Sequence, residues 1–292
     1  MDDLLDERLR LRYHIPVPLT HHYSPVPDIV GVKTQLNRWY KQPTVETIRW
    51  DLQSQKNFLD QLQPYKTEGD GLPSCAQITA EGYGEGYGEV EARLLHCVLR
   101  HFKPRQVIEV GAGVSTFFMF NALRKNNHAD DVDSELMCIE PYPRPKLKEF
   151  VRQNNIKLQA KAVQDVNLEI FRKLEKNDVL FIDSSHVSKI DSDVNFLYLE
   201  VLPNLQPGVV IHIHDIPFPY LTVTPDHPLF DYSLLWNEAA LVKAFLMYNE
   251  AFKVLMCQSY LHHDCPAAIK RIVNSYDERQ HFPASLWLAK VK

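Results

Sequence analysis

The chain has 292 residues, of which 45% are hydrophobic and 24% are charged. These shares are close to those of ordinary globular proteins, so they exclude a collagen-like, a disordered and a coiled-coil chain. Lys and Arg number 32 against 37 Asp and Glu, which gives a net charge of -5, and no basic run offers a footprint for a nucleic-acid backbone.

The first residues are acidic and lack the apolar core of a signal peptide. No apolar stretch approaches the ~18 residues that would span a bilayer. Five scattered cysteines without a C-x-x-C pair argue against a disulfide framework or a zinc ribbon. We therefore expect a cytoplasmic protein with neither a membrane nor a nucleic acid as its partner.

Residues 1–80 are rich in Pro, Tyr and His and have a helical pattern only near 45–62, which predicts an appendage that covers a substrate or mediates a homodimer. A tandem EGYG repeat follows, and then an amphipathic helix that Lys103 and Pro104 end after Phe102. Tyr83 and Tyr87 of the repeat are candidates for a lid, although a surface loop fits equally well.

Beyond Pro104, short apolar runs alternate with helical segments, which is typical of a parallel sheet covered on both faces. The predicted strands are 106–110, 136–140, 158–163, 178–183, 209–214, 252–258 and 285–291, and the predicted helices after the first five are 115–124, 146–154, 167–176, 191–202 and 237–249. No clear crossover pattern joins the last two strands. The sequence thus predicts an α/β domain over residues 81–292, with five parallel strands and an antiparallel terminal pair.

The first predicted strand runs into a turn that contains Gly111 and Gly113, in EVGAGVST. Such a turn presents backbone N–H groups and a helix N-terminus to a ligand. The dinucleotide-binding pattern needs a third glycine where Thr116 stands, so a nicotinamide-dependent oxidoreductase is the weaker alternative. Glu109 at the strand end would repel a pyrophosphate but attract an ammonium or sulfonium group.

This turn resembles the first motif of the class I S-adenosylmethionine-dependent methyltransferases, acidic-x-Gly-x-Gly, and Glu140 matches the acid that holds the ribose hydroxyls in that family. The resemblance covers residues 81–292 and implies a Rossmann-like, seven-stranded methyltransferase sheet with S-adenosylmethionine as its cofactor. The cofactor-binding residues that it implies are Glu109, Gly111, Gly113, Ser115, Thr116, Glu140, Gln164, Asp165 and Asp183.

Carboxylates and imidazoles follow the fourth and fifth predicted strands, in FIDSSH and HIHD. Because the ends of neighbouring strands lie about 4.8 Å apart, we expect Asp183, His186, His214 and Asp215 to converge on one crevice. His212 shares a face with His214 by the period of two, but we expect it to be a core residue.

Two interpretations of this cluster stay open. In the first, Asp183 and Asp215, with His186 or His214, bind a divalent cation such as Mg²⁺ that orients a substrate hydroxyl and lowers its pKa. The metal-dependent O-methyltransferases, which this region resembles, have this arrangement, although Ile216 stands where they have Asn or Asp. In the second, His186 or His214 is a general base without metal.

On either interpretation, the expected catalytic residues are His186, His214 and Asp215, and the expected reaction is methyl transfer to a hydroxyl of a small molecule. A methyltransferase-fold binding protein, or a hydroxylase-like relative without methyl transfer, is the alternative. Weaker candidates are the segment Trp236-Asn237-Glu238 and the cluster His262-His263-Asp264. The cluster is metal-like by composition, but adjacent side chains in a strand would point to opposite faces.

Overall fold

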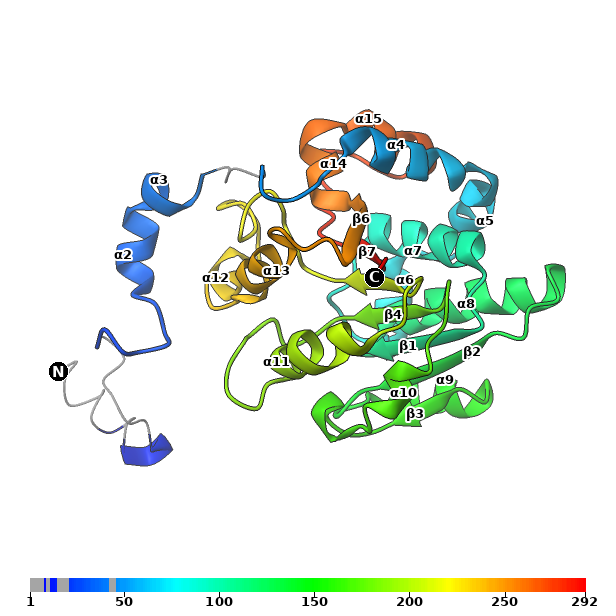
Figure 1. Cartoon of the computed structure of the whole chain (residues 1–292), viewed down its shortest axis with the longest axis horizontal. Coiled ribbons are helices and arrows are strands. Elements are labelled where there is room, and N and C mark those ends of the chain that lie inside the picture. Colours follow the sequence, from blue (N-terminus) through cyan, green and yellow to red (C-terminus); the bar gives the residue numbers. More distant parts are fainter. Residues whose placement is uncertain (1–7, 9–10, 15–20, 42–45) are drawn as a thin grey trace.

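The structure is a computed structural model that describes residue 8 and residues 11–14, 21–41 and 46–292. At its centre lies a seven-stranded sheet in the order β3-β2-β1-β4-β5-β7-β6 (Figure 1). The strands are β1 (Gln106–Val110), β2 (Glu135–Ile139), β3 (Lys157–Gln159), β4 (Val179–Ile182), β5 (Val210–Ile213), β6 (Phe252–Cys257) and β7 (Leu286–Lys290). The first five are parallel, and β7 runs antiparallel to both β5 and β6. The predicted sheet is confirmed.

Helices cover both faces of this sheet (Figure 1). The α-helices are α2 (Ile29–Thr34), α3 (Leu36–Trp39), α4 (Leu52–Gln61), α5 (Lys66–Asp70), α6 (Cys75–Ile78), α7 (Glu89–Phe102), α8 (Val114–Ala129), α9 (Pro145–Gln153), α10 (Glu169–Arg172), α11 (Asp193–Phe196), α12 (Phe230–Ser233), α13 (Glu238–Leu246), α14 (Gln258–Asp264) and α15 (Pro266–Ile272). The η segments are η1 (Gln63–Tyr65), η2 (Thr79–Tyr83), η3 (Val163–Asp165), η4 (Leu197–Val201) and η5 (Leu202–Asn204). The predicted helix after β4 is thus divided among α11, η4 and η5.

Two apolar cores lie on the two sides of the sheet. One contains the buried faces of α7, α8 and α9, and the other contains those of α10, η4 and α13. Every residue of β4 and β5 is buried, as expected for central strands covered from both sides. The two core layers therefore hold the carboxyl ends of β4 and β5 rigidly in place.

Helices α4 to α6 pack into the same core as α7. Leu59, Leu62 and Ile78 are fully buried members of this core, so the region after residue 51 adds to the packing of the sheet. Further toward the N-terminus, α2 and α3 lie to one side of the sheet (Figure 1), where Trp39 stacks on Phe230 at 6.3 Å between ring centroids. The predicted domain boundary at residue 80 stays a prediction, and residues 1–7, 9–10, 15–20 and 42–45 of the proposed appendage lie outside the described part.

Two expectations about local structure are wrong. The connection from β6 to β7 contains two helices, α14 and α15, where we expected no clear crossover pattern. His262 and His263 lie in α14 and not in a strand, because the helix begins directly after β6. His262 is engaged in a hydrogen bond with the hydroxyl of Tyr276, at 2.7 Å from its Nδ1.

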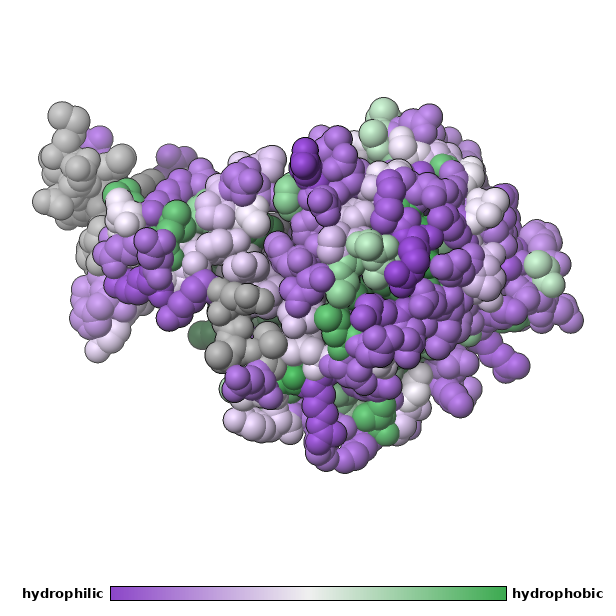
Figure 2. Space-filling view, turned by 90° about the horizontal axis from the view of Figure 1, so that it is seen from above, coloured by the Kyte–Doolittle hydropathy of each residue, from purple (hydrophilic) through white to green (hydrophobic). Residues whose placement is uncertain are grey.

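The face seen in Figure 2 is largely hydrophilic, with small hydrophobic areas between charged and polar ones. Among the described helices, none has the length and apolar character needed to cross a bilayer.

Candidate active site

The turn between β1 and α8 is built around Gly111. Its φ of +82° is a left-handed conformation, and a Cβ there would lie 2.0 Å from the carbonyl oxygen of Asp183. Only glycine fits this position without a shift of the backbone. The turn therefore brings the start of α8, a 16-residue helix, against the end of β4.

Glu109 at the end of β1 stabilises this turn through hydrogen bonds. It is completely buried, and the hydroxyls of Ser115 and Thr116 donate to its two carboxylate oxygens at 2.6 and 2.7 Å. Burial raises the pKa of Glu109 to about 7, although these hydrogen bonds and one from Cys138 oppose the shift. Glu109 thus does not present a free carboxylate to a ligand here, and direct cofactor contacts of these residues stay predictions.

Glu140, at the end of β2, lies against the same turn. It is half-buried and accepts hydrogen bonds from the N–H groups of Ala112 at 3.3 Å and Tyr142 at 2.8 Å. Gln164 in η3 has a buried amide oxygen without a hydrogen-bond partner among the described residues, whereas Asp165 is exposed. The structure thus brings Glu140 to the glycine turn and leaves Asp165 facing solvent.

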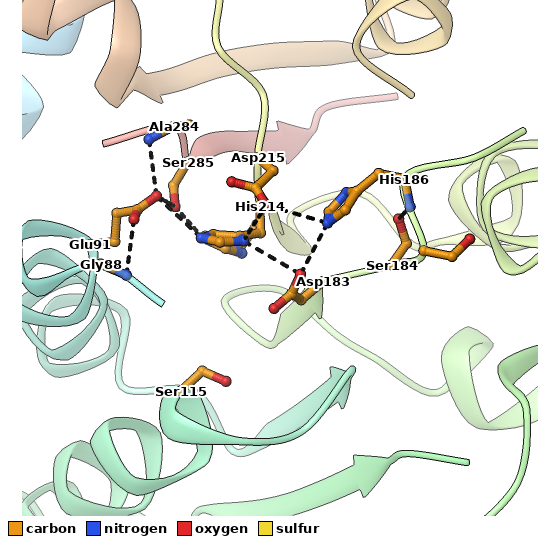
Figure 3. Close-up of polar contacts among 12 residues, drawn as sticks. Gly88, Glu91, Ser115, Asp183, Ser184, His186, His214, Asp215, Ala284 and Ser285 are labelled. Atoms are coloured by element: carbon orange, nitrogen blue, oxygen red, sulfur yellow. Dashed lines mark hydrogen bonds and ion pairs between the residues drawn. The ribbon is translucent and has the colours of Figure 1, made fainter. Parts of the chain in front are cut away.

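Four predicted residues converge where β4 and β5 end (Figure 3). Nε2 of His186 lies 3.5 Å from Oδ1 of Asp183 and 3.4 Å from Oδ2 of Asp215. Nδ1 of His214 lies 3.4 Å from each of the same two oxygen atoms. Two imidazole nitrogens and two carboxylate oxygens therefore alternate around one point.

The sheet register explains this convergence. Ile182 of β4 pairs with Ile213 of β5, so the residues that follow them, Asp183 and His214, are neighbours. His186 and Asp215 have φ values of +59° and +55°, a left-handed conformation that is uncommon for residues other than glycine. Backbone strain of this kind is concentrated at functional sites.

The charges of the cluster stabilise one another. Burial alone would lower the pKa of His186, but hydrogen bonds with Asp183 and Glu238 and the charge of Asp215 raise it to about 10. The pKa of His214 is likewise raised well above its ordinary value by the surrounding carboxylates, against the effect of burial. The two histidines in turn hold the pKa of Asp183 well below its usual range, although burial opposes this.

Two buried glutamates contact the far sides of the histidine rings, and neither is marked by a clear pattern in the sequence. Glu91 of α7 places Oε1 3.3 Å from Nε2 of His214, and Glu238 of α13 places Oε2 2.8 Å from Nδ1 of His186. Glu91 is an ordinary acid in the first turn of a helix, so no local pattern marks it. Glu238 was a weak candidate through its place after the fifth strand.

Tyr83 and Tyr87 of the EGYG repeat are buried, which does not fit an exposed surface loop, and the interpretation as a lid over the cofactor stays a prediction. Tyr83 and Tyr87 are only 3% and 9% exposed, and the ring of Tyr87 packs 4.9 Å from that of His214. His212 lies in the core as expected, stacked on Phe181 with 4.0 Å between ring centroids. Tyr87 thus forms one wall of the cluster.

A pocket of about 290 Å³ opens beside His214 and Asp215. Its walls come from the EGYG segment, from the loop after β5 and from the segment before β7. Val223, Leu229 and Phe282 supply apolar surface. A small molecule in this pocket would lie next to the carboxylate–imidazole cluster.

A family described as a methyltransferase domain matches residues 108–216, the span from β1 to the residue after Asp215. This span contains the glycine turn, Glu140 and the four converging residues, and the strand order agrees with it. The chain carries a class I S-adenosylmethionine-dependent methyltransferase domain. It is thus a methyltransferase, in a Rossmann-like fold.

Several solved methyltransferases have a similar fold at low identity. The methyltransferase PaMTH1 from Podospora anserina, bound to S-adenosylhomocysteine, is 13% identical over 81% of this chain and 88% of its own, with a TM-score of 0.46. The O-methyltransferase TomG from Streptomyces achromogenes, in complex with S-adenosylmethionine, is 15% identical over 88% of this chain and 99% of its own, with a TM-score of 0.46. An O-methyltransferase described as putative, from Klebsiella pneumoniae, is 15% identical over 91% of this chain and 96% of its own, with a TM-score of 0.42. A search of curated proteins finds no significant match.

Proposed function

We propose that this methyltransferase transfers a methyl group from S-adenosylmethionine to a hydroxyl group of a small molecule, with a divalent metal ion held by the cluster at the ends of β4 and β5. The alternating arrangement of two carboxylates and two imidazoles carries the proposal. The cofactor would supply an electrophilic methyl group on a sulfonium.

The residues around the glycine turn fit that cofactor. Gly111 lets the turn pack against the end of β4, and Glu140 offers carboxylate oxygens next to the turn, where ribose hydroxyls could donate to them. Gln164 has a buried amide oxygen without a partner among the described residues, and this oxygen can accept a hydrogen bond from an adenine amino group. Asp183 is 29% exposed in its side chain and borders both this crevice and the cluster.

The cluster fits a metal ion by spacing and by unmet hydrogen bonding. Ligand atoms about 2.1 Å from one ion lie roughly 3.0–3.4 Å apart, close to the four distances of 3.4–3.5 Å found here. His214 is 2% exposed, and neither of its ring nitrogens makes a hydrogen bond of good geometry with a described residue. The nearest ligand atoms of Asp183, His186 and His214 all lie within 4.8 Å of one another.

The ligand types favour zinc, iron or manganese over magnesium. Imidazole nitrogen suits zinc and iron, and carboxylate oxygen suits manganese, whereas Mg²⁺ prefers oxygen ligands and retains several waters. Bound there, the ion would lower the pKa of the acceptor hydroxyl and orient its oxygen. Asp183, His186, His214 and Asp215 would hold it.

The raised pKa values disfavour the interpretation of His186 or His214 as a free general base. A base must be unprotonated at working pH, but a pKa near 10 leaves His186 protonated at neutral pH in the absence of a metal ion. Loss of that proton on binding a cation makes the same ring a ligand.

The pocket beside the cluster would hold the acceptor. It opens at Asp215, whose side chain is 21% exposed, so a hydroxyl in the pocket can reach the cluster. Phe282 and Leu229 offer apolar contacts to the body of the acceptor. Among the described residues that line it there is no Lys or Arg, which suits a neutral or cationic acceptor better than a phosphorylated one.

The test is transfer of labelled methyl from S-adenosylmethionine to a panel of phenols and aliphatic alcohols, with and without a chelator. We expect transfer that the chelator abolishes and added Zn²⁺ or Mn²⁺ restores. Transfer that the chelator leaves unchanged would support the metal-free alternative. Binding of S-adenosylhomocysteine without transfer to any acceptor would support a binding protein or a hydroxylase-like relative.

A further inference from the structure

Each histidine of the cluster has one ring nitrogen toward the two aspartates and the other toward a buried glutamate. For His186 the inner atom is Nε2 and the outer atom is Nδ1, whereas for His214 the inner atom is Nδ1 and the outer atom is Nε2. Figure 3 shows the second half of this arrangement, with Glu91 on the side of His214 away from Asp183. The outer contact of His186 is a hydrogen bond of 2.8 Å, whereas that of His214, at 3.3 Å, is a charge contact without hydrogen-bond geometry.

We propose that Glu91 and Glu238 are positioning residues, which hold the outer nitrogens of His214 and His186 so that the inner nitrogens are free of protons and directed at the metal ion. The inference rests on the metal site of the proposed function. A metal-bound imidazole commonly donates its other N–H to a carboxylate, which fixes the orientation of the ring and makes it a stronger ligand.

Both glutamates are themselves fixed by other donors. The N–H of Ala284 and the hydroxyl of Ser285 donate to Oε1 of Glu91 at 3.0 and 2.9 Å, and the N–H of Gly88 donates to its Oε2 at 3.2 Å. These donors come from the start of α7 and from the segment before β7. The carboxylate of Glu91 therefore has a defined orientation before any ligand binds.

Glu238 is held in the same way on the opposite side of the cluster. The hydroxyl of Ser184 donates to its Oε2 at 2.7 Å, and that of Tyr198 donates to its Oε1 at 3.0 Å. Its burial is almost complete, at 1% exposed. His186 thus contacts a carboxylate that the core of the protein keeps in place.

The charges around the cluster are compatible with the same arrangement. Within the part of the chain that the structure describes, neither Glu91 nor Glu238 has a Lys or Arg nitrogen within the 4.0 Å of an ion pair, and a histidine is the charged partner of each. Together with Asp183 and Asp215, four carboxylates surround two imidazoles. A buried excess of negative charge is costly unless cations compensate it, and two imidazolium groups or one divalent ion between two neutral rings would offset the same two charges.

The first test measures which ring nitrogens carry protons in the Zn²⁺-loaded protein, by long-range proton–nitrogen NMR correlation of the histidine rings. We expect a proton on Nδ1 and none on Nε2 for His186, and the reverse for His214. The opposite pattern at either ring would overturn the proposal, and this measurement needs no variant.

The second test is calorimetric titration of Zn²⁺ into the wild type and the variants Glu238→Gln and Glu91→Gln. We expect affinity to fall by roughly 10- to 100-fold in each, as for other carboxylates behind metal-binding histidines. Glu200→Gln, an exposed glutamate in η4, is the matched control and should bind as the wild type does. Tyr198→Phe removes a donor from Glu238 without touching His186, so it should lower thermal stability more than affinity for Zn²⁺.

The outcomes separate the two proposals. If the wild type and Glu238→Gln bind Zn²⁺ equally while only their melting temperatures differ, the glutamate has a merely structural role and this inference fails, but the proposed function stands. If the wild type binds no divalent ion, the metal part of the proposed function fails and the inference fails with it.

Discussion

Glu109 provides a test of the electrostatics beneath the glycine turn, through the variant Glu109→Gln. Burial raises the pKa of this carboxyl from 4.5 to about 7 in the folded protein. Each pKa unit corresponds to about 1.4 kcal/mol, so the shift amounts to about 3 kcal/mol. Because the folded-state pKa is raised, the contribution of Glu109 to stability is fully present below pH 4.5 and is lost as the pH rises through 7.

Glutamine keeps the shape of the side chain but cannot ionise, and the hydroxyls of Ser115 and Thr116 can rotate to form hydrogen bonds with its amide. We therefore expect the free energy of unfolding of Glu109→Gln, relative to the wild type, to increase by about 3 kcal/mol between pH 4.5 and pH 8. Urea unfolding of both proteins at several pH values measures this difference. A difference that does not vary with pH would show that Glu109 ionises normally in the folded protein, and the reasoning about its burial would be refuted.

Three further predictions concern the crevice. Glu140→Ala should weaken S-adenosylhomocysteine binding roughly tenfold or more in calorimetry, because hydrogen bonds to a charged acceptor are lost. Glu135→Ala, at the exposed start of the same strand, should leave that affinity unchanged. Equal affinity in the two variants would remove the ribose assignment. Gly111→Ala should destabilise the protein by well over the ~1 kcal/mol that a positive φ alone costs. Gly86→Ala, also at positive φ but with no described atom within 4 Å of the added Cβ, should incur only that cost. Similar melting temperatures for the two variants would contradict the predicted collision of a Cβ at Gly111 with Asp183. Affinity for Zn²⁺ should rise up to about tenfold per pH unit between pH 6 and 9 for each imidazole that must lose a proton, because His186 has a pKa of about 10. An affinity that does not change with pH in calorimetry would contradict that raised pKa.

The sheet could be predicted from the sequence because its strands are short, apolar and separated by clear helical patterns. The strands β4 and β5 are buried on both faces and read as nearly continuous apolar runs. The connection between β6 and β7 could not be predicted, because α14 and α15 are only seven residues each and α14 is largely polar, with two histidines. Short helices of this kind depend on tertiary packing more than on sequence period.

The convergence of Asp183, His186, His214 and Asp215 could also be predicted, since it follows from strand ends and register. The partners behind the histidines could not. Glu91 lies in a helix that begins more than 120 residues before His214, and only the packing of α7 against the segment before β7 brings them together. Contacts of this kind leave no local pattern in a single sequence.

The central claim is that the ends of β1, β2, β4 and β5 form one crevice for a sulfonium cofactor and a divalent ion. A crystal structure with S-adenosylhomocysteine and Mn²⁺, with anomalous data to locate the ion, tests it most directly. The account predicts the nucleoside beside Gly111 and Glu140 and one anomalous peak between the rings of His186 and His214. A nucleoside bound elsewhere, or a cluster without the peak at saturating Mn²⁺ and with both rings turned from the aspartates, would contradict it.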